Sequence, residues 1–254
     1  MTGELRIGTS GWSYDHWAGP FYPADLPPRE RLAFYAAHLD SAEINNSFYQ
    51  LPSERTLTAW RETVPEGFRF AVKASRYITH MKKLKDPAQA LDTFFARISL
   101  LADRLGPILF QLPPRWRFNP GRLKGFLEAL SGDFRYAFEL RDPSWIDDRA
   151  LALLSHHRAA FCIYELDGFL SPSEVTTDFV YLRLHGPDGP YRGDYDTGTL
   201  AGWAAAIEGW RARGLDCYCY FDNDEAGHAV ANAMTLSRIL SGADGTPAGP
   251  KCGS

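Results

Sequence analysis

Short apolar runs alternate with amphipathic stretches along most of the chain. Runs of this length, separated by helical patterns, predict buried strands. Eight runs fit this description: 5–10, 41–45, 68–73, 107–112, 136–141, 160–165, 179–185 and 216–221.

Helical spacing of apolar residues fills several of the intervals between these runs. The interval 88–105 predicts a helix that Gly106-Pro107 should end. Asn119-Pro120 predicts an N-cap followed by proline at the first helical position, and Ser53 can cap another helix. One apolar stripe runs through 198–213, formed by Leu200, Trp203, Ile207 and Trp210.

Eight strands, each followed by a helical segment, predict a parallel sheet covered by helices. Eight such units in about 240 residues match a single (β/α)₈ barrel; an open doubly wound sheet is the alternative. We place the barrel over residues 1–241. The end of the chain, 242–254, is rich in Gly and Pro without a core pattern, so it is predicted to be a flexible tail.

The composition is that of an ordinary globular protein, with 254 residues, 45% hydrophobic and 23% charged. The net charge of −4 argues against broad electrostatic binding of nucleic acid. No apolar run approaches the ~18 residues of a membrane span, and the N-terminus enters a strand pattern without a signal peptide. The four cysteines, Cys162, Cys217, Cys219 and Cys252, are expected to be core thiols of a reduced, cytoplasmic protein.

Polar side chains stand where the predicted strands end. In (β/α)₈ barrels the active site lies at the carboxyl ends of the strands, so these side chains should converge on one rim. The rim set is Glu43, Asn45, Lys73, Gln111, Glu139, Arg141, Arg183, His185 and Asn223, joined by the aromatic residues Trp12, Tyr14 and Tyr191. This pattern predicts a pocket with aromatic walls and charged anchors.

The fifth strand carries two of these charges, Glu139 and Arg141, on one face. They are about 6.6–6.8 Å apart along the strand. We expect the deeper Glu139 to meet Lys73 or Arg183 and Arg141 to face a ligand at the mouth. A purely structural network of ion pairs is the alternative, but charges at the ends of at least four strands favour a functional site.

Several segments of the chain resemble the domain of unknown function 72 family. They are GTSGWSYDHWAGPFYP, AEINNSFYQLPS, FAVKASRYITH, ILFQLPPRW, AFELRDPSW, YLRLHG and YFDNDEAGHAVANA, between Leu5 and about Leu240. The resemblance implies a single (β/α)₈ barrel and does not imply an activity. The family more often has two asparagines after the aromatic residue of its last segment, where this chain has Asp222-Asn223.

The rim residues themselves suggest an enzyme for a small anionic or sugar-like substrate. Glu43 and Glu139 are candidate catalytic carboxylates, and Lys73 and His185 are candidate proton-transfer groups. Arg76 and Arg183 should lower the pKa of Lys73 by charge repulsion. The expected substrate-binding residues are Trp12, Tyr14, Asn45, Gln111, Arg141, Arg183, Tyr191 and Asn223.

Other functions remain open at this point. The rim could hold a phosphate-containing ligand or a nucleic-acid end without catalysis, through Lys73, Arg141 and Arg183; nucleic acid is not favoured. An interaction scaffold with an inert rim is a third class. No metal or other cofactor is expected, because we expect the rim to be net basic and to oppose a cation. The rim also does not resemble that of a retaining glycosidase. Such barrels commonly carry carboxylates after the fourth and seventh strands, which here end in Gln111 and His185.

Overall fold

A closed barrel of eight parallel strands forms the centre of the protein. In the computed structural model, which describes residues 1–242, the hydrogen-bonded order is β5-β4-β3-β2-β1-β9-β8-β6, and β5 pairs with β6 to close the ring. The strands are β1 (Leu5–Ser10), β2 (Ser41–Ile44), β3 (Arg69–Lys73), β4 (Leu105–Leu112), β5 (Tyr136–Leu140), β6 (Ala160–Leu166), β8 (Phe179–Leu184) and β9 (Asp216–Phe221). The predicted (β/α)₈ barrel is therefore confirmed.

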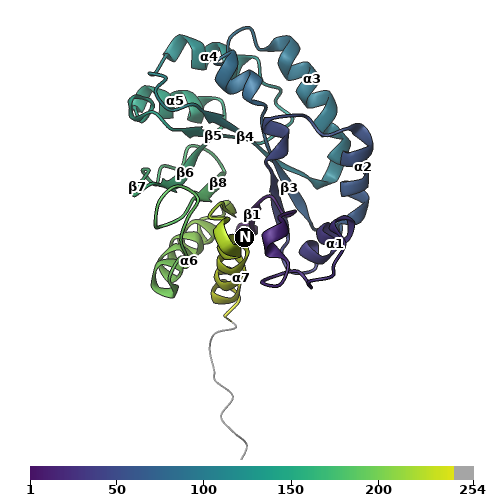
Figure 1. Ribbon diagram of the computed structural model, residues 1–254. Coiled ribbons are helices and arrows are strands. Elements are labelled where there is room, and N and C mark those ends of the chain that lie inside the picture. The colour runs from purple at the N-terminus through teal and green to yellow at the C-terminus, as the bar shows by residue number, and fades with distance from the viewer. Residues whose placement is uncertain (243–254) are drawn as a thin grey trace, which may run out of the picture.

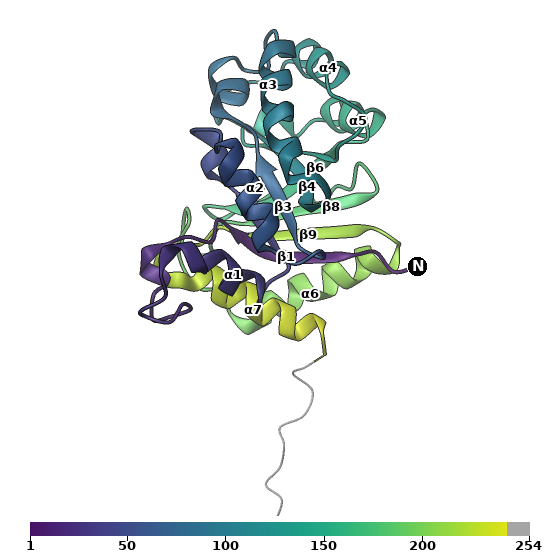
Figure 2. The same cartoon turned by 90° about the vertical axis from the view of Figure 1, so that its right-hand side faces the viewer.

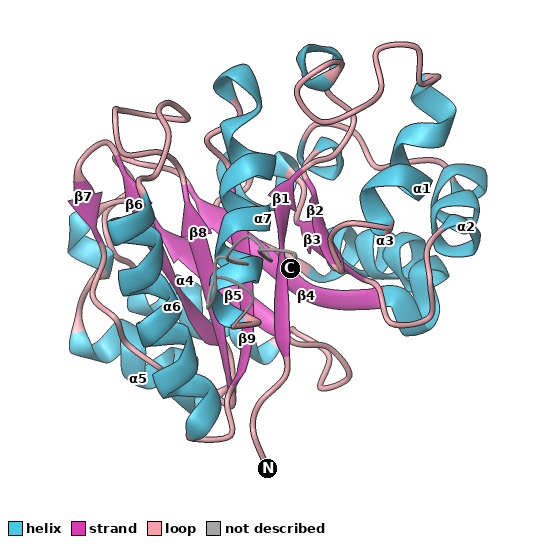
Figure 3. Cartoon of the chain, turned by 90° about the horizontal axis from the view of Figure 1, so that it is seen from below, coloured by secondary structure: helices cyan, strands magenta, loops and turns pink. Residues whose placement is uncertain are grey.

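Helices surround the barrel in chain order (Figure 1). They are α1 (Arg31–Ala36), α2 (Glu54–Thr63), α3 (Ala88–Ile98), α4 (Pro120–Glu128), α5 (Asp148–His156), α6 (Thr197–Ala212) and α7 (His228–Leu240). Figure 2 shows β9 and β1 side by side above α6 and α7. In Figure 3 the strands lie in the middle, with α4, α5 and α6 to the left and α1, α2 and α3 to the right. Among residues 1–242, none of the helices has the length and apolar character needed to cross a membrane.

All eight predicted strands are present, with ends that differ from the prediction by two residues at most. The short strand β7 (Phe169–Leu170), antiparallel to β6, was not predicted. Its two residues are exposed and too few to form a periodic pattern. The tail predicted for 242–254 lies, apart from residue 242, outside the described residues.

The predicted end of the third helix is wrong. Helix α3 ends at Ile98, a 3₁₀ segment η5 (Ser99–Arg104) follows, and Gly106-Pro107 lie inside β4. Ala102 has a positive φ of 47°, which breaks the helix. Pro107 donates no backbone hydrogen bond, and the ladder between β3 and β4 shifts register beside it. The strand therefore tolerates a residue that usually marks its boundary.

The alternation of side chains along the strands sorts the core into two parts. Outward-facing residues such as Ile108, Phe110 and Phe138 pack against the helices. Inward-facing residues fill the barrel with a separate cluster rich in aromatic rings: Ala71, Leu109, Ala137, Ala160, Cys162, Tyr164, Phe179, Tyr181, Tyr218 and Tyr220. Cys162, Cys217 and Cys219 are buried free thiols, as predicted, and Cys252 lies outside the described residues.

Replacing Asn119 by alanine should lower the free energy of unfolding by about 1 kcal/mol. Its side-chain oxygen accepts a hydrogen bond from the backbone N–H of Arg122 at 2.9 Å, and Pro120 begins α4. Urea denaturation of Asn119→Ala beside Asn119→Ser, which keeps a capping oxygen, measures the effect. Equal losses in the two variants would show that the cap contributes nothing.

Candidate functional site

The carboxyl ends of the strands bring a charged cluster together inside the barrel mouth. Inward-facing residues at the ends of β2, β5 and β8, with Asp222 just after β9, form it. Arg183 and His185 stand two residues apart at the end of β8, so both point into the barrel. The chain thus places Glu43, Glu139 and Asp222 within hydrogen-bonding distance of Arg183.

Arg183 is the centre of this cluster and is fully buried. Its Nη1 donates to Oε2 of Glu139 at 2.6 Å, and its Nη2 donates to Oε1 of Glu43 at 2.7 Å. Nη2 also lies 3.0 Å from Oδ2 of Asp222. One guanidinium is therefore within bonding distance of three carboxylates. Buried charges are tolerated when they are paired with an opposite charge and hydrogen-bonded.

Neutral hydroxyl groups complete the coordination of Glu43. Ser10 donates to Oε1 at 2.7 Å and Tyr181 donates to Oε2 at 2.6 Å. Both carboxylate oxygens thus accept a hydrogen bond from a hydroxyl group, and Arg183 adds a third bond to Oε1. Glu43 is fully buried and held in one position.

His185 and Asp222 form a second pair within the cluster. Nδ1 of His185 lies 3.0 Å from Oδ2 of Asp222. Burial alone would raise the pKa of Asp222, but the charge of Arg183 and the bond to His185 hold that pKa below its ordinary value. An ionised Asp222 can accept a hydrogen bond from the Nδ1–H of His185. Nε2 lies 3.4 Å from Nη1 of Arg183.

The prediction that Glu139 and Arg141 serve different partners is wrong. Glu139 meets Arg183 as predicted, but Nε of Arg141 also donates to Oε1 of Glu139. The long arginine side chain folds back across the two-residue spacing. Burial opposes ionisation of Glu139, yet Arg141 and Arg183 hold its pKa well below the usual range.

Arg141 nevertheless keeps one unpaired nitrogen at the mouth. Nη1 donates to the hydroxyl of Tyr191 at 3.1 Å, whereas Nη2 is buried and has no hydrogen-bond partner within residues 1–242. The side chain is 11% exposed. An unpaired buried donor is costly, so Nη2 is a position where a ligand oxygen would be stabilised.

Lys73, unlike Arg141 and Arg183, has no ion pair within 4.0 Å among residues 1–242. Its Nζ lies 4.6 Å from the ring centre of Phe48, a cation–π contact. Burial, and then the positive charge of Arg183, lower the pKa of Lys73 to about 8. The predicted direction is correct, but burial is the larger cause and Arg76 is not among the causes.

His80 also contacts Phe48, with 5.0 Å between ring centres. Burial, followed by the charges of Lys73 and Arg141, lowers the pKa of His80 to about 4. His80 is therefore neutral at pH 7, whereas the pKa of Lys73, about 8, lets its charge change near neutral pH.

The expectation of a net basic rim is wrong once Asp222 is counted. The three carboxylates Glu43, Glu139 and Asp222 balance Arg183, Arg141 and Lys73. Within residues 1–242, no group of three His, Cys, Asp or Glu side chains has a spacing that could hold a metal ion.

The remaining predicted residues differ in how closely they approach the cluster. Gln111 lies opposite Glu139 in the ladder, and its buried Oε1 has no partner within residues 1–242. Tyr14 donates its hydroxyl proton to the carbonyl of Ser10 at 2.5 Å. Asn223 is buried and ties the carbonyl of Gly193 to Asn232.

Trp12 lies outside the cluster because the chain turns at Gly11, where φ is +95°. The turn ends the alternation of β1, and the indole of Trp12 packs on Trp60 of α2, 4.9 Å between ring centres. A Cβ at position 11 would approach the hydroxyl of Tyr14 to 2.6 Å. Glycine is therefore required by both the backbone and the neighbouring ring.

Two hollows adjoin the cluster. A cavity of about 510 Å³ lies between the segment after β1 and helix α2, and Trp12, Tyr14 and Asn45 line it. A second, of about 340 Å³, is lined by Arg141, Tyr164 and apolar side chains that include Phe169. Both volumes are in the range of small-molecule sites.

Sequence reasoning gave no site role to three members of the cluster, Ser10, Tyr181 and Asp222, although it placed Asp222 at the end of the last strand. Each is in phase with an inward-facing residue: Tyr181 precedes Arg183 by two positions, and Asp222 follows Tyr220 by two. The alternation could have identified them. Their hydroxyl and carboxylate groups were overlooked because an inward tyrosine or serine is equally compatible with a plain core.

An eight-stranded parallel barrel surrounded by helices is a TIM barrel. Its polar cluster lies at the carboxyl ends of the strands, where the active sites of such barrels are found. The chain belongs to the family described as "Protein of unknown function DUF72", whose model matches residues 6–251. The resemblance seen in the sequence segments is thereby confirmed.

Three relatives illustrate the similarity. UPF0759 protein YunF of Bacillus subtilis is 25% identical over 270 residues, which cover 93% of this chain and 94% of YunF. UPF0759 protein YecE of Escherichia coli K12 is 32% identical over 144 residues, covering 56% of this chain and only half of YecE. The crystal structure of a DUF72 family protein from Thermotoga maritima has a TM-score of 0.85 at 27% identity, covering 94% of this chain and 99% of that one.

Proposed function

We propose that this barrel is an enzyme that acts on a small anionic or sugar-like substrate, with Lys73 as its proton-transfer group. The observation that carries the proposal is the state of Lys73. It stands at the mouth without a carboxylate partner in residues 1–242, and its pKa of about 8 is close to neutral pH. A group with such a pKa can both give and take a proton.

The neighbours of Lys73 supply binding groups in this proposal. Nη2 of Arg141 would donate to an anionic oxygen, and Oε1 of Gln111 would accept from a hydroxyl group. Glu43 and Glu139 are held by Arg183 in the ionised cluster. They would act as fixed charges around the reacting atoms, and His185 would serve as a second proton-transfer group.

A non-catalytic binder of a phosphate-containing ligand, or of a nucleic-acid end, is the second candidate. The unpaired Nη2 of Arg141 and the nearby charge of Lys73 support it, since both groups would suit a phosphate oxygen. The binder differs from the enzyme only in that it does not convert its ligand. Nucleic acid is the less favoured ligand because the chain as a whole has a net charge of −4.

The test begins with thermal melts of the purified protein against inorganic phosphate, sugar phosphates, sugar acids and small carboxylates. Any compound that raises the Tm is then incubated with the protein and followed by proton NMR. If the signals of the compound disappear with the wild-type protein but persist with a variant that lacks Lys73, the result supports the enzyme. Saturable binding without conversion supports the binder, and no stabilisation by any anion contradicts both.

Replacing Arg141 by glutamine should weaken binding of a stabilising anion by about 10- to 100-fold, the range expected for a hydrogen bond to a charged group. Asp222→Asn should bind the same anion at least as tightly as the wild type, because it removes one of three negative charges from the cluster. Isothermal titration of both variants gives the dissociation constants. Arg61→Gln, at an exposed ion pair on α2, is the matched control and should leave binding unchanged. Equal weakening in Arg61→Gln and Arg141→Gln would contradict a site at the mouth.

A further inference from the structure

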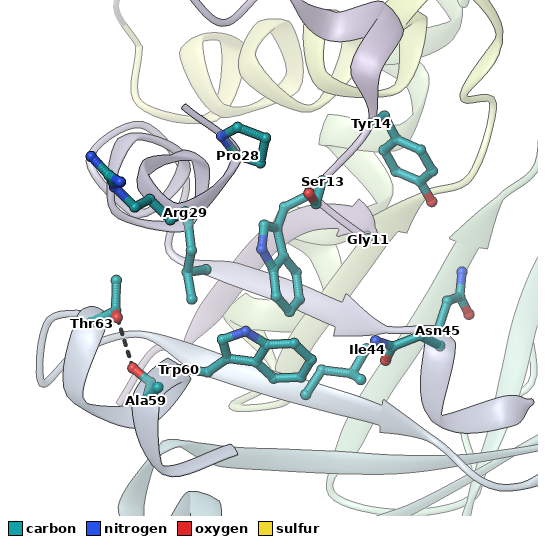
Figure 4. Close-up of a pocket in the computed structure, with 13 residues that line it drawn as sticks. Gly11, Ser13, Tyr14, Pro28, Arg29, Ile44, Asn45, Ala59, Trp60 and Thr63 are labelled. Carbon is teal, nitrogen blue, oxygen red and sulfur yellow. Dashed lines mark hydrogen bonds between the residues drawn. The ribbon is translucent and has the colours of Figure 1, made fainter. Parts of the chain in front are cut away.

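The larger hollow beside the barrel mouth is built around two tryptophans. Trp12, after β1, and Trp60, on α2, meet nearly edge to face, with an interplanar angle of 83°. Figure 4 shows the indole of Trp60 in the middle of the hollow, with Pro28 and Arg29 on one side and Asn45 on the other. The volume of about 510 Å³ leaves room for a ring-sized group.

One buried polar group on this hollow lacks a partner. Oδ1 of Asn45 is buried and has no hydrogen-bond partner within residues 1–242. A buried amide oxygen normally has one. Within the same residues, no hydrogen bond involves the indole nitrogen of Trp12 or Trp60, and neither nitrogen is among the buried unpaired atoms, so both can donate to a molecule in the hollow.

The lining selects the kind of ligand that could supply those partners. It contains amide, hydroxyl and indole groups and a single cation, Arg29, which already contacts Glu30 at 3.4 Å; it contains no carboxylate. The indoles of Trp12 and Trp60 are nearly perpendicular, so they do not form a parallel slot for a flat base. A puckered ring with hydroxyl groups can contact the face of one indole and the edge of the other.

The hollow is adjacent to the charged cluster. Asn45 follows Glu43 by two positions at the end of β2, and Tyr14, another lining residue, donates to the carbonyl of Ser10. Ser10 in turn bonds to Glu43. A molecule lying in the hollow therefore ends close to the residues that we assign to chemistry.

We propose that the hollow lined by Trp12 and Trp60 binds a neutral sugar ring, and that the substrate is a sugar derivative whose anionic part reaches Lys73 and Arg141. The identity of the substrate rests on the proposed function, whereas the binding of a sugar ring in the hollow does not. Asn45 stands between the two parts and bonds to hydroxyl groups of the sugar. Trp60 presents its ring to the C–H face of the same sugar.

The experiment uses methyl glycosides of glucose, galactose, mannose and N-acetylglucosamine as probes, with the free bases adenine and uracil as flat competitors. Saturation-transfer NMR detects binding, and the shifts of the indole N–H signals give dissociation constants. At least one glycoside should bind in the millimolar range and shift the signals of Trp12 and Trp60. Binding of the free bases alone, or of no probe, would overturn the proposal.

Variants locate the bound ring. Trp60→Leu should weaken glycoside binding by about tenfold, and Asn46→Ala, at an exposed lining residue, should weaken it less without affecting folding. Trp203→Leu, on α6 and outside the lining, is the matched control and should bind like the wild type. If Trp60→Leu does not fold, Asn46→Ala decides alone, and unchanged binding in that variant overturns the proposal.

Failure of this inference can be told apart from failure of the proposed function. Glycoside binding should be unaffected by Arg141→Gln, whereas anion binding should be weakened. Anions that bind while every glycoside fails contradict the sugar site and leave the enzyme proposal intact. Glycosides that bind while every anion fails support the sugar site and contradict an anionic substrate.

Discussion

Replacing Arg183 by methionine should lower the free energy of unfolding at pH 7 by at least about 3–5 kcal/mol, the usual result of removing one partner from a buried ion pair. The side chain is fully buried and is the shared partner of Glu43, Glu139 and Asp222. Methionine keeps much of the volume but leaves three carboxylates without that cation. Urea denaturation followed by circular dichroism measures the loss.

The loss should depend on pH in a defined direction. In the wild type, the pKa values of Glu139 and Asp222 are below their ordinary values, so the stability they contribute is fully present above the ordinary carboxyl pKa. It is lost as the pH falls through the lowered values. In Arg183→Met, the buried carboxylates should have higher pKa values than in the wild type, because burial then raises those values without opposition from the arginine. The deficit should therefore be smaller at pH 5 than at pH 7.

An exposed arginine provides the control for Arg183. Arg61 pairs with Asp103 at 3.3 Å, and its side chain is 46% exposed. Arg61→Met should cost less than about 1 kcal/mol at either pH. A deficit in Arg183→Met that matches this control, or one that is the same at pH 5 and pH 7, would mean that the cluster is not held by the arginine.

The strands could be predicted from the sequence because a parallel barrel buries both faces of each strand. Such strands appear as continuous apolar runs, and a charge at the end of a run, as at Glu139, then marks the mouth. The same alternation brought Lys73, Arg183 and His185 to one rim. These features depend on local spacing, which a single sequence contains.

The partners of each charge could not be predicted in the same way. Arg141 bonds to Glu139 because its side chain folds back, a choice that depends on the packing around it. Trp12 leaves the alternation of β1 because Gly11 turns the chain. It then contacts Trp60, which lies on α2, the helix after β2. Such contacts between separate elements are set by the whole fold, so no local sequence pattern predicts the hollow that these rings line.

Replacing Lys73 by methionine should make the protein more stable at pH 7 and much less active. Burial and the charge of Arg183 disfavour the ammonium form, which lowers the pKa to about 8 from the ordinary value of 10.5. The cost of this charge is fully present below pH 8 and disappears as the pH rises towards 10.5. Methionine removes the cost, so Lys73→Met should melt several degrees higher at pH 7, with about 2–4 °C for each kcal/mol.

The advantage of Lys73→Met in stability should shrink as the pH rises from 8 to 10, because the wild-type amine becomes neutral. Conversion of any substrate found by NMR should fall by about 10²- to 10⁴-fold, the usual contribution of a positioned proton-transfer group. Lys124→Met, at a side chain 61% exposed on α4, is the control and should change neither quantity. A Lys73→Met protein that melts no higher than wild type at pH 7 would show that the amine is well solvated, and full activity in that protein would remove Lys73 from the chemistry.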